Sequence, residues 1–132
     1  MKDMKCILMA LVLIGMSSTI FAHEYKCDQV AGEYYPSEKI KINVTVDETK
    51  LYVEYVDGGY EFNGEIDNTY KPTATNRDFV RFTGETTSPA GGEVWFLIQN
   101  GLLSGKDNGY VKEQVRAEGG FFNSKFFCRI VD

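Results

Sequence analysis

The chain has few of the groups from which active sites are commonly built. Its 132 residues include one histidine, His23, and three cysteines. Nucleophilic catalysis by a Ser-His-acid or Cys-His site needs an imidazole held on the framework of the fold. The sequence also has no Gly-x-Ser-x-Gly, no phosphate-cradling glycine loop and no His-Glu-x-x-His. We therefore expect a protein that is not an enzyme and uses no cofactor.

Positive charge is also scarce. Lys and Arg number 14 against 19 Asp and Glu, so the net charge is −5. The basic residues fall in pairs that are scattered along the sequence, at Lys39/Lys41, Arg77/Arg81 and Lys112/Arg116. Nucleic-acid binders concentrate Lys and Arg on one face, so we expect no nucleic-acid partner. The net negative charge also argues against polyanions and anionic lipids.

The N-terminus has the pattern of an export signal. Lys2 and Lys5 precede a short apolar segment, and small residues lead to Ala22, which is typical of a secretory signal peptide. The apolar segment is shorter than the roughly 20 residues that span a bilayer, although a retained signal-anchor is the alternative. We predict a signal peptide at 1–22 and a single exported β domain at 23–132. This domain is expected to be a monomer without a membrane span, in the periplasm or outside the cell.

Cleavage after Ala22 leaves Cys27 and Cys128 near the two ends of the domain. In an exported protein, such a pair predicts a disulfide bond, with two buried thiols as the alternative. Structural zinc sites use four ligands, and two cysteines with one histidine do not supply them. We therefore expect no metal site, and we expect His23 to be a frayed polar terminus.

Alternating apolar residues predict strands along most of the domain. In 39–46 the side chains of Ile40, Ile42, Val44 and Val46 share one face. The strands are expected at 30–35, 39–46, 51–56, 60–66, 79–85, 94–98, 110–117 and 125–131. Both faces of 94–98 are apolar, so this strand is expected to be covered on both sides. After it we expect a bend or bulge at Asn100-Gly101 and the main hairpin at 105–109.

These strands, joined by short connections and without helical periodicity, predict an all-β antiparallel meander of about eight strands. In an open meander the first and last strands are exposed edges, and closure removes those edges. A disulfide between the first and last strands fits closure, because bridged Cα atoms lie close together. We therefore favour a small closed barrel over a two-sheet sandwich.

Tyr25-Lys26-Cys27 after a signal peptide, a β meander and a cysteine in the last strand give a layout that resembles periplasmic inhibitors of c-type lysozyme. In that family a loop that contains Ser-Gly and ends in Tyr inserts into the lysozyme cleft. The segment Ser104–Tyr110 has these residue types at a longer spacing, and the family's second motif has no counterpart after Tyr110. The resemblance implies contact with a secreted enzyme through Ser104 and Tyr110.

Aromatic residues are the main candidates for binding, at 14% of the chain. Phe121 and Phe122 follow two glycines, and Tyr70 lies in the long loop 67–78. Aromatic rings are enriched at interfaces and line cavities, and packing in the core is the alternative. We predict a non-catalytic protein that binds a small ligand or a secreted protein through Phe121, Phe122, Tyr70, Tyr110 and Ser104. The alternatives are an inhibitor of a secreted enzyme and a carboxylate-based hydrolase.

Overall fold

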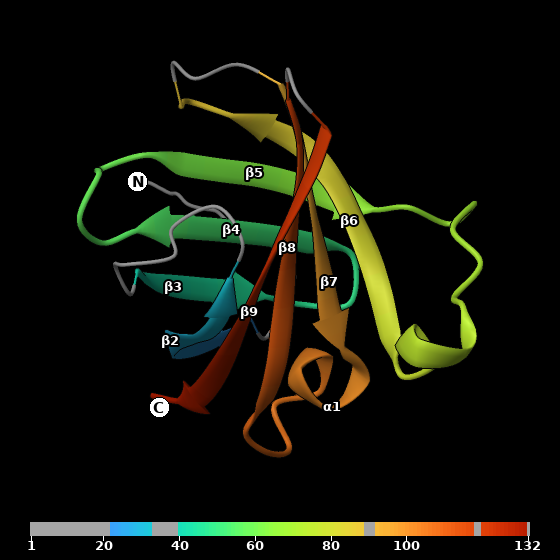
Figure 1. Cartoon of the computed structure of the whole chain (residues 1–132). Coiled ribbons are helices and arrows are strands. Elements are labelled where there is room, and N and C mark those ends of the chain that lie inside the picture. Colours follow the sequence, from blue (N-terminus) through green and yellow to red (C-terminus); the bar gives the residue numbers. More distant parts are fainter. Residues whose placement is uncertain (1–21, 33–39, 89–91, 118–119, 132) are drawn as a thin grey trace, which may run out of the picture.

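Eight antiparallel strands close into a barrel (Figure 1). The computed structural model describes residues 22–32, 40–88, 92–117 and 120–131. Its strands are β2 (His23–Gly32), β3 (Lys41–Val46), β4 (Lys50–Tyr55), β5 (Glu61–Ile66), β6 (Phe79–Thr86), β7 (Glu93–Gln99), β8 (Gly109–Ala117) and β9 (Gly120–Ile130). Each strand pairs with the next, and β9 pairs with β2. The predicted meander and its closure are confirmed, whereas the expected signal peptide lies outside the described residues except for Ala22.

The disulfide joins the two strands that close the barrel. Cys27 in β2 and Cys128 in β9 are direct cross-strand partners, and their sulfur atoms are bonded. The register of this strand pair shifts between Gln29 and Ala31, where β2 carries a bulge. The predicted disulfide is therefore confirmed, and it lies within the sheet beside the closing backbone hydrogen bonds.

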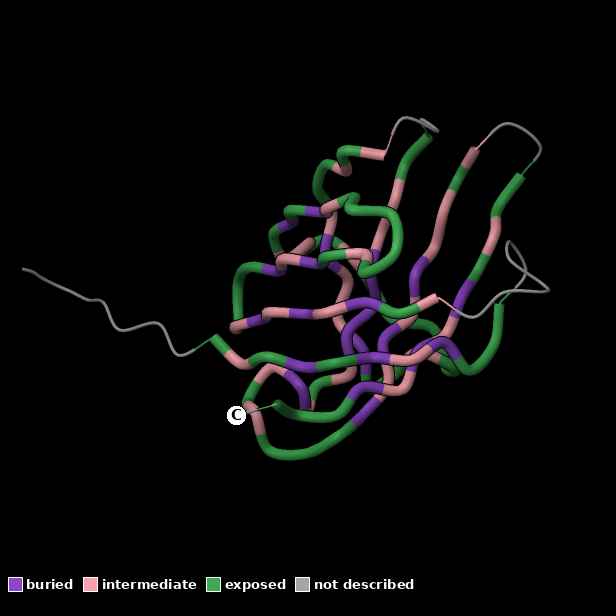
Figure 2. Tube along the Cα trace, turned by 90° about the vertical axis from the view of Figure 1, so that its left-hand side faces the viewer, coloured by how far each residue is buried: buried purple, intermediate pink, exposed green. Residues whose placement is uncertain are grey.

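The barrel interior is filled by side chains. Every second residue is buried in β3, and Leu51 and Val53 are buried in β4, as the alternation predicts. Figure 2 shows buried segments alternating with more exposed ones along the strands. Four phenylalanines, Phe62, Phe82, Phe96 and Phe126, are fully buried, and the rings of Phe62 and Phe96 lie 4.8 Å apart, edge to face. Barrels of eight strands are just wide enough for such a core. These rings therefore pack the core.

β7 is covered on both sides, as predicted. Phe96, Leu97 and Ile98 are consecutive and fully buried. Phe96 and Ile98 belong to the main core, so Leu97 points outward. Its partner on β8 is Lys112, whose Nζ donates to Asn76 Oδ1 at 2.6 Å in the short 3₁₀ helix η1 (Ala74–Asn76). The loop 67–78 therefore lies over the outer side of β7.

Several boundaries differ from the sequence prediction. The first strand begins at His23 rather than at 30, and β9 begins at Gly120 rather than at 125. The expected bend at Asn100-Gly101 is the start of a one-turn helix, α1 (Asn100–Leu103). The buried Tyr25 hydroxyl donates to Leu102 O at 2.8 Å, which fixes this turn from a strand 77 residues away. Among the described residues, no helix has the length and apolar character needed to cross a bilayer.

Candidate binding face

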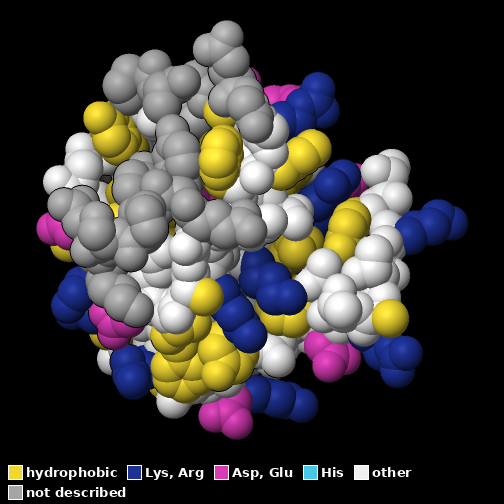
Figure 3. All heavy atoms as spheres, in the orientation of Figure 1, with side chains coloured by type: hydrophobic (Ala, Val, Ile, Leu, Met, Phe, Trp, Pro, Cys, Tyr) yellow, Lys and Arg dark blue, Asp and Glu magenta, His cyan; other side chains and the backbone are white. Residues whose placement is uncertain are grey.

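Charge is distributed unevenly around the barrel. The sequences of β8 and β9 contain four basic residues, Lys112, Arg116, Lys125 and Arg129. Their single acid is Glu113, which is buried. In contrast, β3 to β5 contain three acids and two lysines. Basic residues that are scattered in the sequence are thus gathered by the fold, which differs from the sequence expectation. In Figure 3, dark blue Lys and Arg side chains cross the middle of the face that carries β8 and β9, with hydrophobic side chains around them.

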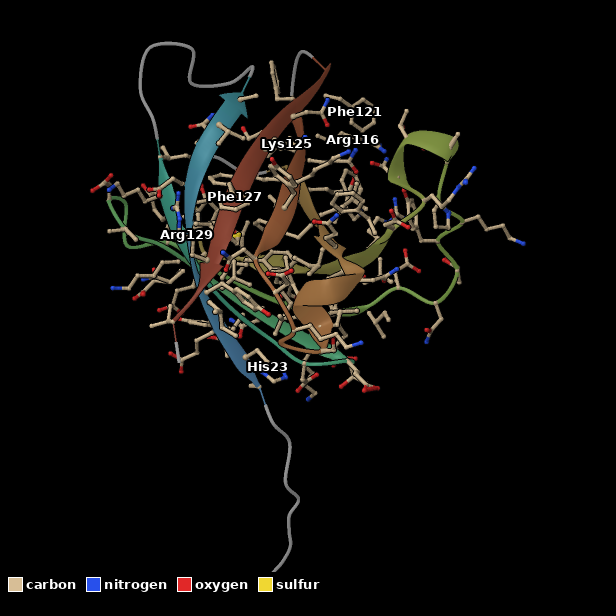
Figure 4. The ribbon with its side chains drawn as sticks, turned by 90° about the horizontal axis from the view of Figure 1, so that it is seen from below. His23, Arg116, Phe121, Lys125, Phe127 and Arg129 are labelled. Carbon is tan, nitrogen blue, oxygen red and sulfur yellow. A yellow bond between two sulfur atoms is a disulfide. The ribbon has the colours of Figure 1, made fainter. Side chains whose placement is uncertain are left out.

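The outer side of β8 and β9 forms a strip of cross-strand pairs. In order along the strands, these pairs are Arg116/Phe121, Gln114/Asn123, Lys112/Lys125 and Tyr110/Phe127. Figure 4 shows Arg116 and Phe121 near one end of this strip, with Lys125, Phe127 and Arg129 following along β9. We call it the β8–β9 strip. It presents two aromatic ends and a polar, cationic middle.

Each cation on this side of the barrel lies over an aromatic ring. Lys125 Nζ is 4.3 Å from the ring centre of Tyr110, and the guanidinium of Arg129 is 5.1 Å from that of Phe127. The guanidinium of Arg116 is 6.0 Å from the ring centre of Phe121. Cations within about 6 Å of a ring centre are attracted to the negative ring face. The face therefore combines rings and cations that are held in place by one another.

A continuous ladder of stacked groups crosses from the long loop to β9. The guanidinium of Arg81 lies between two rings, 4.8 Å from that of Tyr70 and 5.7 Å from that of Trp95. Trp95 stacks in turn on Phe121, with ring centres 6.3 Å apart and an interplanar angle of 30°. Phe121 is 62% exposed and is also contacted by Arg116. We call these five residues the aromatic ladder, and the ladder together with the β8–β9 strip the cation–aromatic face.

Asp67 anchors the ladder. Arg81 donates from Nε and Nη2 to Asp67 Oδ2 at 3.1 and 2.8 Å. The Thr69 hydroxyl and backbone amide donate to Asp67 Oδ1 at 2.6 and 3.0 Å. The hydrogen bonds from Thr69 and Arg81 lower the pKa of Asp67 to about 2. The carboxylate therefore stays charged at neutral pH and fixes both Arg81 and the loop that carries Tyr70.

A pocket of about 470 Å³ lies between η1 and the middle of the β8–β9 strip. Its polar lining comes from Lys112, Lys125, Gln114, Asn123, Thr75 and Asn76, with Ala31, Gly32 and Ser124 near the bulge of β2. A larger hollow of about 630 Å³ lies over β3 to β6 and includes Asp47, Glu65 and Glu85 among its lining residues. That hollow is also lined by Ala22, which belongs to the expected signal peptide. The smaller pocket is therefore the better candidate site for a chain that is cleaved at the expected position.

The predicted site residues separate into two groups. Phe121 and Tyr70, far apart in the sequence, both belong to the aromatic ladder. Tyr110 belongs to the β8–β9 strip, where its ring lies 5.3 Å from that of Phe127. Phe122 is half-buried on the opposite, barrel side of β9, and Ser104 is exposed beyond α1. Phe121 thus lies on a strand rather than in a loop, and Phe122 and Ser104 are not part of the cation–aromatic face.

The segment 104–110 is folded back on the barrel. Ser104 Oγ donates to Gly101 O at 3.2 Å, whereas Tyr110 belongs to β8 and points to its outer side. Gly105 has φ of 68°, and a Cβ at this position would lie 2.3 Å from the ring of His23. Only glycine fits this close approach. His23 is accordingly half-buried at the start of β2, and the expectation of a frayed terminus is wrong.

Among the described residues, one carboxyl group is buried in the barrel wall. Glu113 is 6% exposed, and its carboxylate accepts a hydrogen bond from the Tyr55 hydroxyl. Burial raises the pKa of Glu113, and the Tyr55 bond offsets part of that effect.

Comparisons with known proteins give no further guide to function: no protein-family model, no curated protein and no solved structure matches the chain. Within the described ranges, no cluster of three or more His, Cys, Asp or Glu is placed to hold a metal ion. The geometry of the cation–aromatic face is therefore the main guide to function.

Sequence reasoning missed the residues that join this face together. Arg81 and Trp95 connect Tyr70 to Phe121, and neither was a candidate. The alternation of side chains along two strands could have indicated this face. One side of β8 carries residues 110, 112, 114 and 116, and one side of β9 carries residues 121, 123, 125, 127 and 129. Basic and aromatic residues occupy most of these positions.

Proposed function

We propose that this protein is a non-catalytic binding protein of the exported compartment, and that it binds an acidic surface of a secreted protein through the cation–aromatic face. One observation carries the proposal: all five cations on the outer side of β6, β8 and β9 lie over rings, in six cation–ring contacts. The small closed barrel is a suitable rigid support for such a face.

The residue types of this face are those that dominate protein interfaces. Trp, Tyr and Arg are enriched among the residues that contribute most binding energy. The face holds Trp95 beside Arg81 in the ladder and Tyr110 beside Phe127 at the other end of the strip. Because stacking already restricts these long side chains, less conformational entropy is lost when a partner binds. A preorganised face of this kind therefore favours binding of a second macromolecule.

Charge complementarity sets the chemistry of the partner. The outer side of β8 and β9 carries four cations, of which Arg116 pairs with Glu93 in β7 and Arg129 with Asp28 in β2, at the two margins. The lysines in the middle have no carboxylate within ion-pairing distance among the described residues. Carboxylates on a partner would complement this surface and speed association. Inhibition of a secreted enzyme, which the resemblance to lysozyme inhibitors implies, would be one consequence of such binding.

Site-specific photo-crosslinking in the exported fraction tests the proposal. Phe121 is replaced by benzoylphenylalanine in one protein, and Tyr60, which is 38% exposed on the β4–β5 turn, is replaced in the control. We expect a protein adduct from position 121 that position 60 does not give. The adduct should weaken in about 1 M NaCl, where the Debye length is about 3 Å. Absence of an adduct at 121, or equal adducts at both positions, would contradict the proposal.

A further inference from the structure

The pocket in the middle of the cation–aromatic face has a polar lining that includes two lysines. Its described lining residues supply two lysines, three side-chain amides and two hydroxyls, from Lys112, Lys125, Asn76, Gln114, Asn123, Thr75 and Ser124, and include no Asp or Glu. At about 470 Å³ it falls within the range of small-molecule sites, roughly 300–1,000 Å³. Its walls come from three strands, β2, β8 and β9, and from η1.

The two lysines repel each other in the absence of a ligand. Lys112 and Lys125 are directly opposite on β8 and β9, an arrangement that destabilises a sheet when the charges are alike. Burial lowers the pKa of Lys112, and the charge of Lys125 lowers it further. The only hydrogen bond recorded for the Lys112 ammonium among the described residues goes to Asn76 Oδ1. Since an ammonium has three donors, it has donors left for a ligand.

Aromatic rings position both ammonium groups. Lys112 Nζ lies 4.6 Å from the ring centre of Phe79, and Lys125 Nζ lies 4.3 Å from that of Tyr110. Such contacts hold a cation without neutralising its charge. Lys112 is therefore held toward β6 and η1, and Lys125 toward Tyr110, while the positive charge of both remains available to an anion.

We propose that this pocket binds an oxyanion, a carboxylate or phosphate group, between Lys112 and Lys125, with the amides of Gln114 and Asn123 as further donors. An oxyanion supplies only acceptors, whereas the lysines and amides supply donors. It would also remove the repulsion between the two lysines. The choice of this face rests on the proposed function. The oxyanion site adds to that function the chemical group that is recognised at the centre of the face.

A titration with inorganic phosphate, followed by ¹H–¹⁵N NMR of the whole mature protein, tests the pocket without any partner. We expect saturable shifts of the side-chain amides of Gln114 and Asn123. Lys112→Gln and Lys125→Gln should each weaken binding at least tenfold, whereas Lys125→Arg, which keeps the charge, should retain most of it. Lys106→Gln makes the same change of charge on an exposed loop residue and should leave the affinity unchanged.

Shifts that do not saturate, or that weaken equally in Lys106→Gln, would overturn the proposal, because they would show general charge screening. A second arm distinguishes the source of the oxyanion. Tighter binding of a tetraglutamate peptide than of phosphate indicates carboxylates on a protein chain, and the reverse indicates a free phosphate-bearing ligand. Phe121→Ala should leave phosphate binding intact, so loss of partner crosslinking and loss of the oxyanion site can be told apart.

Discussion

Replacement of Asp67 by Asn tests how the aromatic ladder is anchored. The Asp67 side chain is 13% exposed and holds Arg81, which is 28% exposed. Its pKa is lowered from 3.8 to about 2, a difference that corresponds to at most about 2.5 kcal/mol. Because the pair lies near the surface and solvent screens it, we expect Asp67→Asn to reduce the free energy of unfolding by about 1 kcal/mol at neutral pH.

The pH dependence provides the sharper part of this test. Asp67 has a lower pKa in the folded chain, so its contribution is present above pH 3.8 and is lost as the pH falls toward 2. Urea unfolding of the parent protein and of Asp67→Asn should therefore differ at neutral pH and converge at about pH 2. Asp57→Asn, on the exposed β4–β5 turn, is the matched control. Equal stability at neutral pH, or a difference that persists at pH 2, would refute the reasoning.

Three further predictions concern the framework. Replacement of Cys27 and Cys128 by Ser opens a loop with a sequence separation of 101, and chain entropy predicts a loss of about 4.7 kcal/mol in the free energy of unfolding, measured in urea. Tyr25→Phe removes the hydroxyl donor to the buried Leu102 carbonyl, which keeps its bond from the Gly105 amide at 3.3 Å, and should cost about 0.5–1.5 kcal/mol by the same measurement; an unchanged midpoint would argue against the Tyr25 bond. Because burial raises the pKa of Glu113, the folded chain keeps this proton to higher pH than the unfolded chain. The free energy of unfolding should therefore fall as the pH rises from 4.5 through the raised pKa, by at most about 1.4 kcal/mol per pH unit. Glu113→Gln should flatten that part of the profile, and an identical slope in the variant would exclude Glu113 as its cause.

The fold was largely predictable because its main signals are local. Alternation in 41–46 identifies β3, and two apolar faces in 94–98 identify a strand that is covered on both sides. The cysteine pair added the one long-range constraint that favours closure. The features that the sequence did not predict depend on contacts between residues that are far apart in the chain. The helix α1 is held by Tyr25, and the start of β2 is set by pairing with β3 and by His23 packing on Gly105.

The candidate site was predictable only in part. Phe121 and Tyr70 stand out as aromatic residues near glycines or in a long loop, but their connection depends on the register of β6, β7 and β9. Lys112 and Lys125 are 13 positions apart in the sequence and become a pair only through the β8–β9 hairpin. Cross-strand partners of this kind cannot be read from composition or from net charge. That is why an acidic chain can carry a basic face.

If the cation–aromatic face is the binding surface, affinity for the partner should depend on Phe121. Titration calorimetry with the partner identified by crosslinking measures this affinity for three proteins: the parent protein, Phe121→Ala and the control Tyr60→Ala. We predict that Phe121→Ala weakens binding at least tenfold, which is about 1.4 kcal/mol, and that Tyr60→Ala leaves it unchanged. Equal affinities for the parent protein and Phe121→Ala, with the fold intact, would contradict the account.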